Sequence, residues 1–266
     1  MDVQHKKNVK NLLLIIQYDG SGYNGWQRLA TTKKTIQGMI EECLCDILGE
    51  EITIIGSGRT DTGVHALSQV ANFYTASDMG TELLRERMNC HLPEDIRINS
   101  IEEVYKSFHS RYKAISKTYE YRIELGDRQS VFTNKHCYFL KKPLDLTAME
   151  RASALLIGEH DFKGFSTDRK DGKSTVRILY DIKIFMKTEN KHGRSIETVC
   201  ICLNGNGFLY NMVRIIAGTL IEIGEGKRKP ECINDILKSK NRELAGQTAM
   251  AEGLYLIDVL YDIPNY

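Results

Sequence analysis

The first 105 residues alternate between two hydrophobic periodicities, and this alternation constrains the fold more than any other feature of the chain. Short apolar or alternating runs, typical of β-strands, cover residues 11–20, 51–56, 68–75 and 96–105. Apolar side chains at helical spacing follow the first run at Ile36, Met39, Ile40, Cys43, Ile47 and Leu48. Gly49 is the expected stop of this helix. A second helix is expected over 81–93, with Thr81 as N-cap and Pro93 as terminator. The predicted order is therefore β-α-β-β-α-β.

The rest of the chain repeats a similar order of elements without a repeat in sequence. Strands are expected over residues 115–125, 176–187, 195–205 and 253–263. Helices are expected over 145–160, with Asp145 as cap, over 209–226 and over 230–240. This similarity predicts an α+β fold of two related ferredoxin- or RRM-like units with mixed, mainly antiparallel sheet. A shift in composition near residues 106–112 marks the boundary, which gives domains 1–107 and 108–266.

The charge and the cysteine content indicate which cellular compartment and which binding partners fit this chain. The net charge is +1 and the pI about 7.6, so any polyanion site must be a local basic patch. Seven cysteines occur without a CxxC pair, which favours buried thiols of a reducing cytoplasm over disulfides or zinc. The run Leu12–Ile16 is too short to span a membrane or to form the core of a signal peptide. We expect a cytoplasmic protein without membrane attachment.

The stretch GSGRTDTGVHA, residues 56–66, places Arg59, Asp61 and His65 in a glycine-rich loop directly after a predicted strand. It lacks the lysine of a phosphate-binding P-loop, a third metal ligand and the G-x-S-x-G elbow of a serine hydrolase. Two interpretations remain from spacing alone. One is a surface turn with an Arg–Asp pair. The other is a carboxylate that acts as nucleophile or base, kept ionised by an arginine, in a loop open to a bulky substrate.

Five motifs in the same order resemble those of the tRNA pseudouridine synthase A family. They are GRTDTGVHA (58–66), QYDGSGYNGWQ (17–27), KTYEYRI (117–123), GNGFLYNMVRIIAGTLIEIG (205–224) and TAMAEGLYLIDVLY (248–261). The resemblance implies two α+β units that share one continuous sheet with the active cleft between them. It also implies a homodimer without cofactor or metal, which isomerises uridines to pseudouridine in the anticodon stem-loop of tRNA, at positions 38–40.

Residue roles follow from the same resemblance. Asp61 is the implied catalytic nucleophile, and Arg59 is implied to hold the target nucleotide out of the helix. Tyr119 is implied to pack against the uracil, Arg214 to pair with Asp61, and His65 to shape the substrate-binding cleft. Whether the carboxylate attacks C1′ of the ribose or C6 of the base stays open, as does the group that removes the C5 proton.

Basic segments that could contact RNA phosphates cover residues 5–10, 31–34, 168–177 and 226–229. Two other functions would use the same residues. A non-catalytic RNA-binding protein would keep the scaffold without chemistry, and a nucleoside glycosylase would use a lone carboxylate to release free base.

Overall fold

A computed structural model describes residues 9–167, 174–191 and 194–262. The chain divides into two compact units, residues 1–115 with 258–266, and residues 116–257. Each unit is described by itself below.

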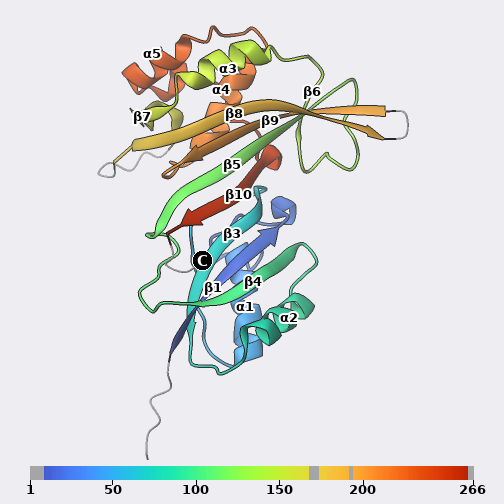
Figure 1. Ribbon diagram of the computed structural model, residues 1–266. Coiled ribbons are helices and arrows are strands. Elements are labelled where there is room, and N and C mark those ends of the chain that lie inside the picture. Colours follow the sequence, from blue (N-terminus) through green and yellow to red (C-terminus); the bar gives the residue numbers. More distant parts are fainter. Residues whose placement is uncertain (1–8, 168–173, 192–193, 263–266) are drawn as a thin grey trace, which may run out of the picture. The chain divides into compact units, whose positions relative to one another are not determined.

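Residues 9–113 of the first unit contain four strands and two α-helices in the predicted β-α-β-β-α-β order (Figure 1). They are β1 (Lys10–Tyr18), α1 (Ile36–Leu48), β2 (Ile55–Gly56), β3 (His65–Thr75), α2 (Thr81–His91) and β4 (Ile96–Val104). Strand β1 lies between β3 and β4 and pairs antiparallel with both, and β2 pairs antiparallel with β3. Helices α1 and α2 pack against each other, and α2 packs on β4. The core between helices and sheet includes Leu14, Ile16, Ile40, Leu44, Phe73 and Met88.

Two of the predicted element ends needed correction. Gly49 ends α1 as expected, in the left-handed region at φ 66°, where its N–H bonds the carbonyl of Cys45. Thr81, however, is the first residue of α2 and not its cap, because Gly80 occupies the cap position without a side-chain hydrogen bond. The strand expected over 51–56 shrinks to Ile55–Gly56.

The buried face of α1 includes two polar residues that its apolar spacing does not predict. Gln37 and Glu41 are buried, whereas Met39 is only half-buried. Glu41 accepts the N–H of Ile54 at 3.0 Å, and Gln37 donates to the carbonyl of the same residue at 3.3 Å. These side chains supply the backbone partners that a full-length strand would have supplied, since buried backbone groups are nearly always paired.

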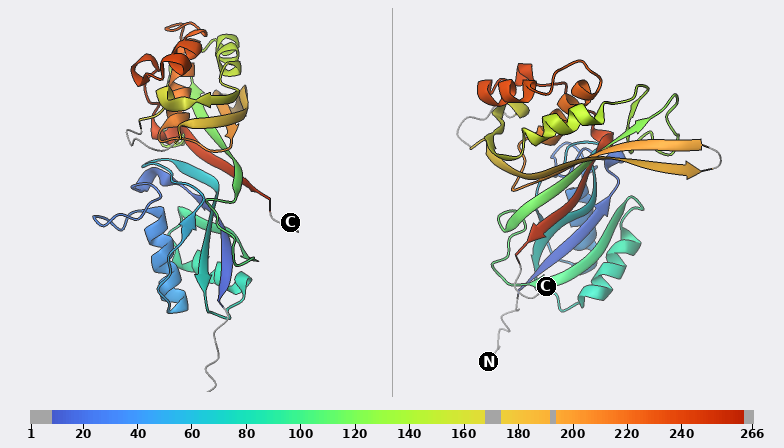
Figure 2. Two further views of the ribbon diagram at one scale, coloured as in Figure 1. Left: turned by 90° about the vertical axis from the view of Figure 1, so that its left-hand side faces the viewer. Right: turned by 45° about the horizontal axis from the view of Figure 1, so that its top comes forward.

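The second unit is built from most of β5 and the elements that follow it (Figure 2). They are β5 (Ala114–Leu125), β6 (Tyr138–Leu140), α3 (Leu146–Ala154), β7 (Gly158–Asp161), β8 (Val176–Lys191), β9 (Arg194–Gly205), α4 (Met212–Gly224), α5 (Cys232–Ser239) and β10 (Leu254–Tyr261). The strand order is β5-β9-β8-β7 with antiparallel pairs, and β6 pairs parallel with β5. Helices α3, α4 and α5 gather on one side of this sheet (Figures 1 and 2).

All three predicted helices of this unit are shorter than expected, and α3 differs most. Asp145 caps α3 as predicted, with its side chain accepting the N–H of Ala148 at 2.9 Å. The helix ends at Ala154, and Gly158–Asp161 form β7 on the edge of β8. Gly158 has φ 108°, a backbone conformation that a helix cannot contain, so the change from helix to strand occurs here.

Helix α4 is buried over nearly its whole length and is held by the segment 245–250. A Cβ on Gly218 would lie 1.9 Å from the carbonyl oxygen of Gln247, so only glycine allows this approach. The hydroxyl of Thr219 accepts the N–H of Gly246 at 2.9 Å. Both contacts fix the helix that carries Arg214.

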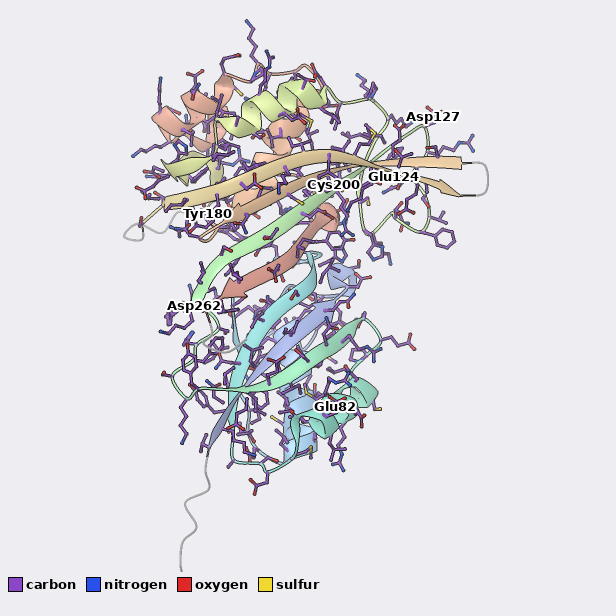
Figure 3. All side chains as sticks on the ribbon, viewed as in Figure 1. Glu82, Glu124, Asp127, Tyr180, Cys200 and Asp262 are labelled. Carbon is purple, nitrogen blue, oxygen red and sulfur yellow. The ribbon has the colours of Figure 1, made fainter. Side chains whose placement is uncertain are left out.

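A charged cluster on β5 and β8 surrounds the buried carboxylate of Glu120, with Arg122 half-buried and Lys187 exposed. Nε of Arg122 donates to Glu120 at 2.6 Å, Lys187 lies 3.4 Å from the same carboxylate, and the Arg122 guanidinium stacks 3.8 Å from the ring centre of Tyr255. Figure 3 places Cys200 on neighbouring β9. Burial raises the pKa of the Cys200 thiol, as is usual for an inert structural cysteine. All seven cysteines are free thiols.

The predicted α+β class is confirmed. Within each unit the paired strands run antiparallel except β5 with β6, and β10 contributes residues to both units. Among the described residues, no helix combines the length and the apolar character needed to cross a membrane.

Candidate active site

The glycine-rich loop lies between β2 and β3 of the first unit, and its backbone is pinned at both ends. The N–H of Ser57 donates to the carbonyl of Val70 at 2.7 Å. A tight turn follows, in which the N–H of Val64 donates to the carbonyl of Asp61 at 3.1 Å. Gly63 adopts φ 80° within this turn, which a residue with a side chain adopts only under strain. The turn therefore holds the backbone of Asp61 in one conformation.

The loop packs directly on the glycine-rich segment that follows β1. The N–H of Trp26 donates to the carbonyl of Thr60 at 3.0 Å. A Cβ on Gly25, which has φ 83°, would lie 2.8 Å from that same carbonyl oxygen, and a Cβ on Gly20 would lie 2.0 Å from the carbonyl oxygen of Val64. The glycines of this segment are thus required for two backbones to touch. The sequence alone did not predict this packing.

Arg59 and Asp61 stand on the same loop but differ in exposure. The Arg59 side chain is exposed, whereas Asp61 is half-buried. Between them, Thr60 is buried and turned inward, where its hydroxyl lies 2.7 Å from that of Tyr18. Because Thr60 points inward, Arg59 and Asp61 on either side of it lie at the surface of the unit.

His65 is the first residue of β3 and is buried, with 1% of its surface exposed. The N–H of Gly20 donates to its Nδ1 at 3.2 Å, and Oδ1 of Asp19 lies 3.1 Å from the same nitrogen. His65 therefore braces the turn at Asp19–Gly20 from below.

Tyr119 of the second unit lies on β5 opposite Leu203 of β9. It is 8% exposed, and its ring meets the ring of Phe208 edge to face, with centroids 5.1 Å apart. This arrangement fixes the plane of the Tyr119 ring.

Arg214 of the second unit lies in the first turn of α4, where two neighbours orient its guanidinium. Nε donates to the carbonyl of Ala249 at 2.8 Å, and Nη1 donates to Oδ1 of Asn211 at 3.1 Å. Its backbone carbonyl accepts the N–H of Ala249 at 3.1 Å. Asn211 holds the helix start at φ 60°, a left-handed conformation that asparagine tolerates better than most residues. The side chain is therefore preoriented by its own unit.

The five predicted site residues are distributed over both units. Arg59, Asp61 and His65 belong to the first, and Tyr119 and Arg214 to the second. Within the first unit, the three lie on one short loop and the start of the strand after it. The roles predicted for all five are taken up below as proposals.

The basic segments differ in how their charges are used. Lys33 pairs with Glu42 at 2.8 Å, and Lys34 beside it is exposed. In the segment 226–229, Arg228 pairs with Glu222 and donates to the carbonyl of Leu244 at 2.7 Å, so it serves the fold. Residues 5–8 and 168–173, which make up most of the other two predicted basic segments, lie outside the described residues.

The α+β fold and the order of the five motifs fit the class of pseudouridine synthases that the sequence resembles. The sequence profile of the family described as tRNA pseudouridine synthase matches residues 14–113 and 152–262. The chain belongs to this family, and the resemblance noted from the sequence is confirmed.

Curated relatives match along nearly the whole chain. The tRNA pseudouridine synthase A of Caldicellulosiruptor bescii is 45% identical over 253 residues, which cover 95% of this chain and 100% of the relative. The tRNA pseudouridine synthase A 2 of Clostridium tetani is 45% identical over 254 residues, 95% of this chain and 99% of the relative. The tRNA pseudouridine synthase A of Bacillus sp. strain KSM-64 is 45% identical over 248 residues, with coverage of 93% and 98%.

Proposed function

We propose that this protein isomerises uridine to pseudouridine in the anticodon stem-loop of tRNA, at positions 38–40, with Asp61 as the nucleophile. As a member of the family it is an enzyme of the isomerase class. The observation that carries the proposal is the fixed backbone of Asp61: the turn to Val64, together with the two bonds of Thr60, holds a half-buried carboxylate at a defined place. A nucleophile must be held in this way to attack one atom of a bound nucleotide.

The other residues of the loop fit supporting roles. The exposed guanidinium of Arg59, two residues from Asp61, suits a contact that keeps the target nucleotide extruded from the stem. His65 shapes the site by holding the Asp19–Gly20 turn against the loop. A carboxylate serves equally for attack at C1′ of the ribose or at C6 of the base, so both routes belong to the proposal.

The second unit supplies the remaining roles. In the proposal, Tyr119 offers its aromatic ring to the uracil, and the edge contact with Phe208 keeps that ring in place. Arg214 pairs with the Asp61 carboxylate, with Asn211 and Ala249 orienting the guanidinium. We further propose that the protein acts in the cytoplasm as a homodimer and needs no metal or cofactor, as the resemblance implies.

The test is conversion of an unmodified tRNA transcript by the purified protein in buffer that contains EDTA. Pseudouridine is then mapped along the transcript, and released base is measured in the same sample. We expect pseudouridine at positions 38–40 and no free uracil. Free uracil would identify a glycosylase, and tight tRNA binding without any conversion would identify a non-catalytic RNA-binding protein. Turnover that disappears with EDTA and returns with added zinc would contradict the metal-free mechanism.

A further inference from the structure

A buried cluster of hydrogen-bonding side chains lies beneath the Asp61 loop, formed by Tyr18, Ser57, Thr60 and Gln69. The hydroxyl of Tyr18 lies 2.7 Å from that of Thr60. Tyr18 also shares a hydrogen bond with Gln69. The hydroxyl of Ser57 donates to Oε1 of Gln69 at 2.6 Å, and Nε2 of Gln69 donates to the carbonyl of Gly58 at 3.2 Å. Tyr18 and Gln69 therefore contact three residues of the loop, Ser57, Gly58 and Thr60.

The backbone at the end of β1 directs the Tyr18 side chain into this cluster. The register of β1 on β3 shifts between Ile16 and Tyr18, after which Tyr18 pairs with Ala66 at the start of β3. Its side chain is only 3% exposed, and its ring lies 6.1 Å from that of Trp26. Because both the backbone and the buried ring of Tyr18 are held in place, its hydroxyl has one position.

Thr60 is consequently held from two directions. Its side chain meets Tyr18, and its carbonyl accepts the N–H of Trp26 at 3.0 Å. Thr60 directly precedes Asp61. Contacts that fix the side chain and the carbonyl of Thr60 therefore also fix the backbone that leads into Asp61. A buried hydroxyl left without its partner costs about 1–3 kcal/mol, which makes the pair a firm constraint on the loop.

The chemistry of Tyr18 separates it from the reacting groups. Burial raises the pKa of its hydroxyl, and the hydrogen bonds with Thr60 and Gln69 offset only part of that rise. The phenol therefore stays protonated at any pH at which tRNA is intact, and it is not the base that removes the C5 proton. The remaining function for Tyr18 is to position neighbouring residues.

We propose that Tyr18 is a positioning residue: its hydroxyl, held against Thr60, sets the placement of the Asp61 carboxylate for attack. The inference rests on the proposed role of Asp61 as nucleophile. It predicts that the rate of the chemical step depends on this hydrogen bond, whereas affinity for tRNA does not, because Tyr18 is enclosed beneath the loop.

The experiment compares variants by single-turnover conversion of tRNA with saturating enzyme. Tyr18→Phe and Thr60→Val each remove one side of the hydrogen bond, and Thr60→Ser keeps the hydroxyl. Tyr74→Phe is the matched control, since it removes a tyrosine hydroxyl that bonds the Lys106 carbonyl at 3.0 Å on the exposed surface of the same unit. The dissociation constant for tRNA and the urea midpoint are measured for every variant.

We expect Tyr18→Phe and Thr60→Val each to slow the chemical step by about ten- to a hundredfold, as small misplacements of a reacting group do. Their tRNA dissociation constants should stay within about threefold of wild type. Thr60→Ser and Tyr74→Phe should react at the wild-type rate. The Tyr18→Phe/Thr60→Val double variant should be no slower than Thr60→Val alone, because both changes break one interaction.

A wild-type rate for Tyr18→Phe, or losses that multiply in the double variant, would overturn the inference. If one variant does not fold, the other removes the same bond and decides the question. Asp61→Asn in the same assay separates this failure from a failure of the proposed function. An active Asp61→Asn refutes the nucleophile, whereas an inactive Asp61→Asn beside a fully active Tyr18→Phe refutes only the positioning role.

Discussion

The backbone N–H of Trp26 donates a hydrogen bond of 3.0 Å to the carbonyl oxygen of Thr60, the residue before Asp61. This one contact joins the two glycine-rich segments of the first unit. It requires that no side chain stand between them, and Gly25 meets that requirement. The placement of Asp61 therefore depends on a residue that is 36 positions earlier in the chain and does no chemistry.

Gly25→Ala should destabilise the first unit and displace the Asp61 loop. The new Cβ would lie 2.8 Å from the Thr60 carbonyl oxygen, and the residue has φ 83°. Gly49→Ala is the matched control, because Gly49 also has a left-handed backbone, at φ 66°, but has nothing within 4 Å of the new Cβ. Urea unfolding should show a loss of about 1 kcal/mol for Gly49→Ala, from the backbone alone, and of about 2–4 kcal/mol for Gly25→Ala. Equal losses would mean that the contact with Thr60 carries no constraint.

Glu222 should contribute stability that depends on pH. Burial opposes ionisation of its carboxyl group, but the N–H of Gln247 at 2.9 Å and the Arg228 guanidinium outweigh it and lower the pKa below the ordinary value of 4.5. A lowered pKa stabilises the folded protein above the ordinary value, and this contribution is lost as the pH falls through the folded value. Glu222→Gln should therefore cost about 1–2 kcal/mol at neutral pH.

Urea unfolding of wild type and Glu222→Gln between pH 7 and pH 3 checks this prediction. The difference in stability should be constant above about pH 5 and should close below it. The control is Glu82→Gln, which breaks an exposed pair with Arg85 on α2 and should leave the stability almost unchanged at every pH (Figure 3). A difference that grows toward low pH would show that the Glu222 carboxylate does not stabilise the fold.

Affinity for tRNA should fall steeply with salt, and Lys34 should account for part of that slope. Lys34 is exposed beside Lys33, two residues after the bridge between Leu29 and Thr32. Each phosphate contact that is lost lowers the slope of log K against log salt by about one. Lys34→Ala should therefore weaken binding similarly for different tRNA species and flatten the slope. Lys183→Ala is the control and should leave both unchanged, because Lys183 is an exposed residue of β8 outside the predicted basic segments. The same salt slope for wild type and Lys34→Ala would show that Lys34 does not contact the RNA.

Local signals in the sequence were sufficient for much of the fold. The spacing of α1, its stop at Gly49 and the Asp145 cap of α3 each depend on a few neighbouring residues, and the structure contains all three. The buried polar pair Gln37 and Glu41 could not be found in this way, because their partner Ile54 comes from another part of the chain. The edge strand β7 was missed for the same reason, since it exists only by pairing with β8.

In the candidate site, too, residues with a local sequence signal could be predicted, whereas residues that act through distant contacts could not. Arg59, Asp61 and His65 stand out because charged residues are unusual in a glycine-rich loop. Tyr18, Thr60 and Gln69 carry no such signal, because a tyrosine, a threonine and a glutamine in strands or loops are ordinary residues until their contacts are seen. The glycines of the segment 20–25 were a usable sign of close backbone approach.

The central claim is that Asp61 is the nucleophile, and Asp61→Asn tests it most directly. The amide is nearly isosteric with the carboxylate but is a very poor nucleophile, so folding and tRNA affinity should change little. The measurement is release of tritium from tRNA that carries 5-tritiated uridine, in a single turnover with saturating enzyme. The rate should fall at least about a thousandfold, which corresponds to about 4 kcal/mol of transition-state stabilisation. A rate within about tenfold of wild type would show that this carboxylate is structural and would contradict the mechanism.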